Sequence, residues 1–224
     1  MEKIFSYLSV LIFCLSGTTL AAQSSKMSVE DPKMELKLVE TVRFNADTET
    51  KSSEESRWLE INISYKLAKL MENSAEKWLD DVEVDCELLM PTTYKGRSGV
   101  YAYLTGKFTY LSIPCDGKMH YEKLFIPPQI LRRYKKAGEK IRKEMLKEIY
   151  AKATFYTKDR KMIGEVYAGP KGKSDEVVKS VFKKVSEPGA LVINVENVIL
   201  PRNKSPWAPL NYDYYDLIKD DVRK

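Results

Sequence analysis

Three carboxylates at every second position are the residues whose spacing best suits chemistry. Glu83, Asp85 and Glu87 alternate with apolar residues, so a strand would place them on one face about 7 Å apart, just after Asp80 and Asp81. Such a strip could supply oxygens to calcium, or the acid and base of a glycosidase. It lacks the central glycine and closing glutamate of an EF-hand loop. We favour a solvent-facing strip that pairs with Lys or Arg on neighbouring strands.

Other catalytic chemistry has little support in the sequence. A serine triad needs a histidine base, and His120, inside a predicted strand, is the only histidine. The G-x-S-x-G, H-E-x-x-H, P-loop and G-x-G-x-x-G patterns are absent, and no spacing indicates a Ser–Lys dyad. One histidine and three cysteines argue against a His-rich metal enzyme or a Cys₄ zinc site. We therefore expect His120 to be structural, and we expect no enzyme activity, metal or cofactor.

The first 22 residues predict a secretory signal peptide. A short charged start precedes an apolar run at 4–15 and an A-x-A-like cleavage site at 19–21. The run is shorter than the roughly 20 residues that span a bilayer. A lipoprotein anchor at Cys14 and an uncleaved anchor remain alternatives. We expect the mature chain to begin near Gln23 and to reside in the periplasm, at the outer membrane or outside the cell.

Removal of the signal peptide leaves two cysteines. An even pair in an oxidising compartment predicts a disulfide between Cys86 and Cys115, which would contribute about 3–4 kcal/mol. The alternative is a reactive thiol pair. That alternative lacks C-x-x-C spacing, and the acidic neighbours Asp85 and Glu87 oppose thiolate formation.

A basic segment lies between residues 127 and 149, with eight Lys and Arg against three Glu. Its local charge equals the +5 of the whole chain. We predict that it binds a phosphate-rich membrane or an anionic polymer. Nucleic acid is disfavoured by the export signal. The alternative is a solvated face whose long side chains cover apolar surface. The candidate residues are Arg132, Arg133, Lys135, Lys136, Lys140 and Lys143.

The carboxyl-terminal segment is rich in aromatic residues and proline. Trp and Tyr supply large contact areas and dominate interface hot spots. We predict that Trp207, Tyr212, Tyr214 and Tyr215 bind a partner protein. The alternative is a tail that packs back over the domain.

Hydrophobic alternation predicts the elements that must position these residues. It is clearest at 59–67 and 82–88, and weaker strands are expected at 36–44, 100–113, 119–126, 150–156, 162–168 and 191–200. Residues 100–126 and 150–168 are expected to form hairpins. Gly106 inside a strand predicts a bulge.

Two segments have helical spacing. The first begins at Pro127, and Gly138 weakens it by about 1 kcal/mol, so it could form two shorter pieces. The second follows Ser174 with two acidic residues in its first turn, although its β-branched residues make a strand a competitor.

The sequence therefore predicts a single domain, an antiparallel immunoglobulin-like β-sandwich with one or two inserted helices. Its length of 224 residues suits one domain, and 11% aromatic residues exclude a disordered chain. We place a flexible leader at 23–33, the sandwich at 34–200 and an aromatic and acidic C-terminal segment at 201–224.

Three motifs carry a resemblance to a known family. They are Trp58-Leu59-Glu60-Ile61, Phe125-Ile126-Pro127-Pro128 with Tyr134, and the Pro-Trp-Ala-Pro-Leu-x-Tyr-Asp-Tyr ending at 206–214. With the signal peptide and the strand pattern, they resemble exported pilus-associated proteins of immunoglobulin-like fold. That family is encoded near type IV pilus assembly genes in gut-dwelling diderm bacteria. The chain lacks a pilin-type N-terminal helix, so the resemblance implies association with pilus or envelope and not a role as the major pilus subunit. It implies no catalytic residues.

Three functions from different classes follow. The leading expectation is a non-enzymatic exported protein that binds a partner in the cell envelope, in pilus assembly or adhesion. The second is a secreted hydrolase of peptide or glycan that uses the carboxylate strip. The third is a periplasmic module that rests on an anionic membrane surface.

Overall fold

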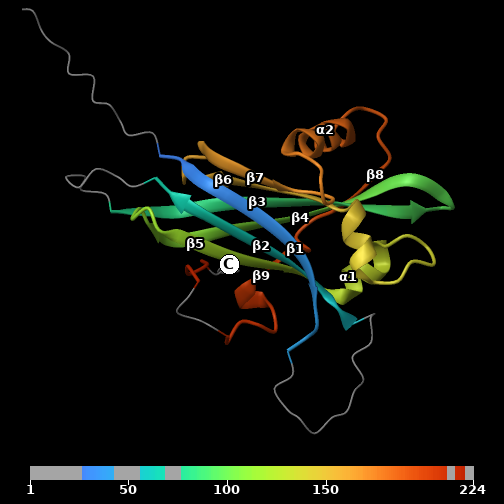
Figure 1. Ribbon diagram of the computed structural model, residues 1–224, viewed down its shortest axis with the longest axis horizontal. Coiled ribbons are helices and arrows are strands. Elements are labelled where there is room, and N and C mark those ends of the chain that lie inside the picture. The colour runs from blue at the N-terminus through green and yellow to red at the C-terminus, as the bar shows by residue number, and fades with distance from the viewer. Residues whose placement is uncertain (1–26, 43–55, 69–76, 211–214, 220–224) are drawn as a thin grey trace, which may run out of the picture.

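The computed structural model describes residues 27–42, 56–68, 77–210 and 215–219, and in these residues two β-sheets pack against each other (Figure 1). The predicted signal peptide with Cys14 lies outside the described residues, as do Tyr212 and Tyr214.

The described residues form nine strands and four short helical segments. The strands are Val29–Val39 (β1), Trp58–Leu67 (β2), Trp78–Tyr94 (β3), Arg97–Pro114 (β4), Met119–Ile126 (β5), Tyr150–Tyr156 (β6), Met162–Ala168 (β7), Val192–Val195 (β8) and Leu200–Pro201 (β9). The α-helices are Pro128–Tyr134 (α1) and Asp175–Val185 (α2), and the 3₁₀ segments are Lys143–Glu148 (η2) and Arg202–Lys204 (η3).

The strands form a four-stranded sheet, β1-β2-β5-β9, and a five-stranded sheet, β7-β6-β3-β4-β8. Among the described strands every neighbouring pair is antiparallel except β4 and β8, which run parallel. The predicted β-sandwich with inserted helices is therefore confirmed. The sheets approach each other along one side at β1 and β7, where a Cβ on Gly164 would lie 2.5 Å from the Cβ of Val29.

The core lies between the inner faces of the two sheets, and strict alternation fills it. In β2 the residues Leu59, Ile61, Ile63 and Tyr65 are at most 2% exposed. Their partners across the core come from β3, β4 and β6, among them Phe155, whose ring centroid lies 4.7 Å from that of Tyr65. Each such aliphatic side chain contributes about 1.5–3 kcal/mol on burial.

Three local expectations are wrong. Residues 100–126 are not a hairpin, because β4 lies in the five-stranded sheet and β5 in the four-stranded one. The apolar run 191–200 is split between β8 and β9, again in different sheets. Gly106 causes no bulge, since it stands in regular register opposite Cys86. Alternation reports which face of a strand is buried and is the same whichever sheet the strand joins.

The leader is shorter than predicted, and both predicted helical segments are present. β1 begins at Val29, so the leader predicted for 23–33 extends too far along the chain. The first helical segment forms the two shorter pieces α1 and η2, and Gly138 between them has a φ of 78°, which glycine adopts without strain. The second helical segment is α2, with Asp175 and Glu176 in its first turn, and it lies over β6 and β7 in Figure 1.

The predicted disulfide between Cys86 and Cys115 is wrong. Both residues are buried, and no bond joins them. Cys86 lies opposite Gly106 in the middle of β4, whereas Cys115 follows the end of that strand, where its amide N–H donates to the carbonyl of Lys77. At about 3.3 Å per residue the intervening strand separates the two cysteines by roughly 30 Å, against a Cα separation below about 7 Å in a disulfide.

Alkylation of the mature chain provides a direct check. In denaturant without reductant, the chain from residue 23 to 224 should take up two labels, because both thiols are present. Under native conditions labelling of Cys86 should be slow, because burial raises the pKa of its thiol and excludes the reagent. A denatured chain that takes up no label until it is reduced would contradict this arrangement.

Candidate functional site

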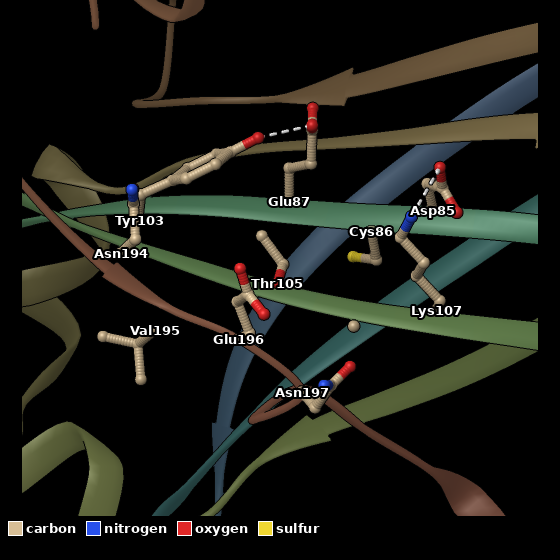
Figure 2. A pocket seen from close by; sticks show the side chains of 11 residues that line it. Asp85, Cys86, Glu87, Tyr103, Thr105, Lys107, Asn194, Val195, Glu196 and Asn197 are labelled. Atoms are coloured by element: carbon tan, nitrogen blue, oxygen red, sulfur yellow. Dashed lines mark hydrogen bonds and ion pairs between the residues drawn. The ribbon is translucent and has the colours of Figure 1, made fainter. Parts of the chain in front are cut away.

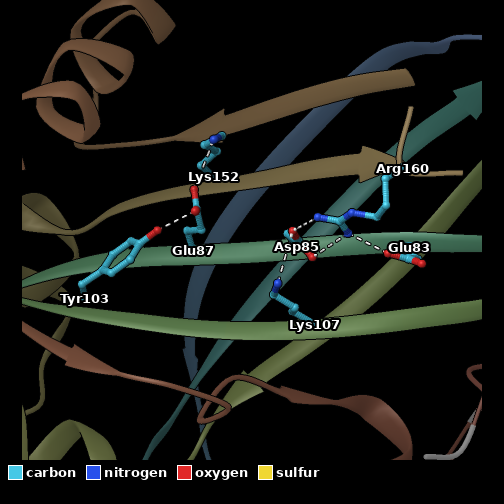
Figure 3. Close-up of polar contacts among 7 residues, drawn as sticks. All are labelled: Glu83, Asp85, Glu87, Tyr103, Lys107, Lys152 and Arg160. Atoms are coloured by element: carbon cyan, nitrogen blue, oxygen red, sulfur yellow. Dashed lines mark hydrogen bonds and ion pairs between the residues drawn. The ribbon is translucent and has the colours of Figure 1, made fainter. Parts of the chain in front are cut away.

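The outer face of the five-stranded sheet carries the carboxylate strip identified in the sequence. Glu83, Asp85 and Glu87 alternate with buried residues of β3 and are half-buried between β4 and β6. Figure 3 shows their side chains along one face of the strand, each directed to a cation or a hydroxyl.

Arg160, in the turn between β6 and β7, holds the first two carboxylates. Its Nη1 lies 2.6 Å from Oε2 of Glu83 and its Nη2 lies 2.8 Å from Oδ2 of Asp85. The guanidinium also lies 4.1 Å from the ring centroid of Tyr156. These hydrogen bonds and charges raise the pKa of Arg160, which therefore stays ionised. Lys107 of β4 approaches Asp85 from the other side at 3.9 Å.

Glu87 has a separate pair of partners. Lys152 of β6 places its Nζ 3.2 Å from Oε2 of Glu87, and the hydroxyl of Tyr103 donates to Oε1 at 2.5 Å. Burial, followed by the hydrogen bond to Glu87, raises the pKa of Tyr103, so its hydroxyl remains a donor. The predicted cross-strand pairing of the strip is thus confirmed, because each of the three carboxylates contacts a cation.

A pocket of about 470 Å³ opens beside this strip (Figure 2). The outer face supplies one wall, and the chain that leaves β8 supplies the other. The pocket is lined by Asp85, Cys86, Glu87, Tyr103, Thr105, Gly106, Lys107, Asn194, Val195, Glu196 and Asn197. Three carboxylates therefore face one lysine, and amide, hydroxyl and phenol groups add hydrogen-bonding capacity. Glu196 is exposed and forms no ion pair within the described residues.

The second wall exists because the chain changes sheets here. β8 ends at Val195, and Asn197 takes a φ of 58°, a left-handed conformation that asparagine tolerates better than most residues. The amide groups of Val198 and Ile199 then donate to the carbonyl of Thr105 at 3.0 and 3.3 Å. These bonds fix residues 194–197 as the rim of the pocket.

The C-terminal segment packs on the outer face of the four-stranded sheet. The indole of Trp207 stacks on Phe125 at 4.5 Å between ring centroids and meets Trp58 edge-on at 5.5 Å. Such aromatic pairs contribute about 0.5–1.5 kcal/mol each beyond their burial. Arg202 is 8% exposed, and its Nη1 donates to the carbonyls of Trp207, Ala208 and Leu210. This geometry corresponds to the alternative of a tail packed back over the domain.

The end of the described chain is fixed in the same way. The guanidinium of Arg202 lies 4.7 Å from the ring centroid of Tyr215. Asp216 places Oδ2 3.1 Å from Nδ1 of the buried His120. Residues 217–219 then lie along β4, where the amide of Lys219 donates to the carbonyl of Thr109 at 2.7 Å. Of the four predicted partner-binding aromatics, Trp207 and Tyr215 therefore contact the domain itself.

Comparison with known proteins places this architecture in a family. A family model matches residues 18–222 of the chain. The chain belongs to that family.

A solved structure supports the fold. The crystal structure of a protein from Akkermansia muciniphila superimposes with a TM-score of 0.64. It is 16% identical, and the match covers 87% of this chain and 95% of that one. The sporulation control protein Spo0M from Bacillus subtilis matches with a TM-score of only 0.27 at 8% identity, over 69% of this chain and 54% of that one, so it adds nothing. No curated protein matches the chain.

The predicted basic residues lie on α1, at the start of η2 and on the loop between them, and Figure 1 shows α1 near one end of the sheets. Lys136 forms an ion pair with Glu148, and Lys135 donates to the carbonyl of Glu139. The four exposed members of the predicted set are Arg132, Arg133, Lys140 and Lys143.

Within the described ranges no three His, Cys, Asp or Glu side chains are grouped to hold a metal ion. In the same part of the chain, no helix has the length and apolarity needed to cross a bilayer.

The sequence missed the second wall of the pocket and the residue that neutralises the strip. Asn194, Glu196 and Asn197 lie in the segment 191–200, which its apolar residues predict as one strand, and their polarity is the signal that argues against a single strand. Arg160 lies in a turn far along the chain from β3, so only the pairing of β3 with β6 brings it to Glu83.

Proposed function

We propose that this protein is an exported, non-enzymatic binding protein of the cell envelope, associated with type IV pilus assembly or adhesion. The support is the resemblance of the sequence motifs to exported pilus-associated proteins. The family match over residues 18–222 and the shared fold of the solved structure agree with a single domain of this architecture. The pilus association rests on the resemblance.

The observation that carries a binding role is the ion-paired outer face with its pocket. Because Arg160, Lys107 and Lys152 hold the strip in place, the face is ordered before any partner arrives, which lowers the entropic cost of binding. The pocket contributes Glu196 at its rim as an exposed carboxylate. A basic or amide-rich segment of a partner protein suits this lining, since it would meet carboxylates, amides and a tyrosine hydroxyl.

The contacts of Arg160 with the carboxylate strip argue against the hydrolase hypothesis. A glycosidase needs a carboxyl group that is free to donate a proton to the glycosidic oxygen, whereas two carboxylates of the strip are already engaged by a cation. Arg160 contacts both Glu83 and Asp85 at ion-pair distance. Loss of glycan or peptide turnover on changing Glu83 or Asp85, if any turnover were measured, would support the hydrolase instead.

A pull-down from native cell envelope tests the proposal. The bait is the mature chain from residue 23 to 224, compared with its Glu196→Lys variant. This change reverses one exposed charge at the pocket rim and removes no ion pair of the described residues. We expect wild type to recover pilus or envelope proteins specifically, and Glu196→Lys to recover at least about tenfold less, because a like charge at an interface costs on the order of 1–2 kcal/mol or more.

Glu187→Lys is the matched control, since it makes the same charge change at an exposed residue outside the pocket lining. It should recover the partner as wild type does. Equal recovery by all three baits would remove the pocket from the interface. Recovery of polysaccharide or lipid alone would overturn the pilus proposal.

A further inference from the structure

Three stretches of chain meet at the end of the molecule where β5 leads into α1. The turn between β3 and β4 carries the exposed residues 93–99, and its end projects beyond the sheet near α1 in Figure 1. The amide of Ala137, in the loop after α1, donates to Oγ1 of Thr93 at 3.4 Å. Residues of β3, β4, this loop and η2 line one hollow of about 330 Å³, including Pro91, Lys136 and Lys147. The hairpin and the basic segment therefore form one continuous surface, which we call the basic end.

The basic end is strongly electropositive. Residues 93–99 and 127–149 contain ten Lys and Arg against three Glu. One of the acids, Glu148, is neutralised by Lys136. Eight of the basic side chains are exposed: Lys95, Arg97, Arg132, Arg133, Lys140, Arg142, Lys143 and Lys147. Only residues 127–149 stand out as basic in the sequence, because Lys95 and Arg97 of the hairpin are distant from them along the chain.

An exposed aromatic residue lies among these cations. Tyr94 is 49% exposed beside a tight turn in which Lys95 and Gly96 have φ values of 48° and 74°. The Nζ of Lys95 lies 5.4 Å from the centroid of the Tyr94 ring. A tyrosine has an apolar ring and a polar hydroxyl, so it suits the headgroup level of a bilayer. Flanking Lys and Arg are attracted to anionic lipid at about 1 kcal/mol each near the surface.

We propose that the basic end docks on a membrane surface that carries anionic phospholipid headgroups, with Tyr94 at the headgroup level. The exposed Tyr94 favours lipid over a soluble anionic polymer, which would need the cations alone. This attachment is independent of what the pocket binds, because Glu196 and the strip lie on the outer face and none of the residues that line the pocket belongs to the basic end.

Sedimentation with lipid vesicles tests this proposal on the mature chain from residue 23 to 224. Vesicles of phosphatidylcholine mixed with phosphatidylglycerol should bind the chain, and vesicles of phosphatidylcholine alone should not. Binding should weaken steeply with added salt. The double variant Lys95→Glu with Arg97→Glu should weaken binding at least about tenfold, since two attractions near the surface become repulsions. Neither side chain forms an ion pair in the described structure.

The control is Lys171→Glu with Lys173→Glu, which makes the same charge change at exposed residues outside the basic end. It should bind within about twofold of wild type. Tyr94→Ala should weaken binding to the mixed vesicles and leave binding to soluble dextran sulfate unchanged. The proposal is overturned if the mixed vesicles bind no protein, if both double variants bind equally, or if Tyr94→Ala binds vesicles as wild type does.

Discussion

Gly106→Ala is expected to destabilise the protein by about 3 kcal/mol, the upper end of the range for overpacking a filled site. A Cβ at this position would lie 2.6 Å from the carbonyl oxygen of Ile199 and 2.7 Å from Cζ of Phe108. The oxygen belongs to backbone that the Thr105 carbonyl holds in place, so it cannot move aside as a flexible side chain would. Urea unfolding measures this change, and the melting temperature should fall by roughly 6–12 °C.

The contrast with Gly96 separates a steric clash from backbone strain. Gly96 has a φ of 74° and no atom within 4 Å of its Cβ position. Gly96→Ala should therefore cost only about 1 kcal/mol, through the left-handed conformation alone. A loss at Gly106 no larger than at Gly96 would show that the chain from β8 to β9 yields easily at this point.

The close approach at Gly106 also explains why the pocket exists. Only a glycine in the middle of β4 lets the chain at Ile199 cross so near to the sheet, and this crossing sets residues 194–197 as the second wall. A glycine in a strand predicts either a bulge or a close approach, and the sequence does not distinguish the two. The partner of the approach lies far along the chain, in a segment that alternation treats as one strand.

Alternation predicted the strands well where one face is buried and the other is charged. β2 and the middle of β3 have that pattern, and the carboxylate strip follows directly from it. Pairing order could not be predicted in the same way. β4 and β5 are separated by a short turn typical of hairpins, yet each joins a different sheet, because the choice depends on packing between faces and not on local sequence.

The C-terminal segment shows a related limit. Its aromatic residues are equally suited to bind a partner or the domain itself, since both uses bury the same surface. Trp207 packs on the domain itself because Phe125 and Trp58, on adjacent strands of the four-stranded sheet, contact its ring. Neither residue is near it in sequence. A buried arginine that collects backbone carbonyls, as Arg202 does, has no sequence signature either.

Stability of this protein is expected to fall as pH rises from about 5 to 8, and Glu122→Gln is expected to reduce that fall. Glu122 is 3% exposed and points into the core from β5. The hydroxyl of Tyr65 donates to its Oε1 at 3.2 Å, and Tyr110 of the other sheet also hydrogen-bonds it. Burial, assisted by the charge of Asp216, raises the pKa of Glu122 well above its ordinary value despite the tyrosine hydrogen bonds.

The sign of the effect follows from proton binding. Above its ordinary pKa near 4.5, Glu122 in the unfolded chain releases its proton while the native state retains it. The native state then binds more protons, so the free energy of unfolding decreases as pH rises. His120 acts in the same direction. Burial lowers the pKa of His120, but the hydrogen bond and charge of Asp216 outweigh it, and the net shift is upward. Its contribution is complete below about pH 6.5 and is lost as pH rises through the native pKa.

Ion pairs on the surface do not change the dependence of stability on pH between pH 5 and 8. Hydrogen bonds from Lys219 and Lys158 lower the pKa of Asp81, and Lys66 does the same for Asp31, both from a value of 3.8. Stability from such carboxylates is lost only as pH falls below about 4. Between pH 5 and 8 the two buried groups Glu122 and His120 should therefore determine how steeply the free energy of unfolding decreases with pH.

Urea unfolding at several values between pH 5 and 8 measures this slope. We expect wild type to lose on the order of 1–3 kcal/mol across the window, at about 1.4 kcal/mol per unit of pKa difference. Glu122→Gln keeps a hydrogen-bond acceptor for the tyrosines and cannot ionise, so its slope should be shallower and its stability at pH 8 at or above wild type. Glu122→Leu separates charge from hydrogen bonding, because it leaves the hydroxyls of Tyr65 and Tyr110 without that acceptor, at about 1–3 kcal/mol each at every pH.

The exposed Glu144→Gln serves as the control and should keep the wild-type slope. A wild-type protein more stable at pH 8 than at pH 5 would mean that Glu122 ionises in the folded state without penalty, which requires a cation at the seam between β5 and β4. The positive charge of Arg202, in the C-terminal segment, acts against burial and lowers the pKa of Glu122. In that case Arg202→Met should restore the expected decrease in stability as pH rises. Arg202 would then have two roles, because it would hold the carbonyls of the C-terminal segment and also neutralise Glu122 between the two sheets.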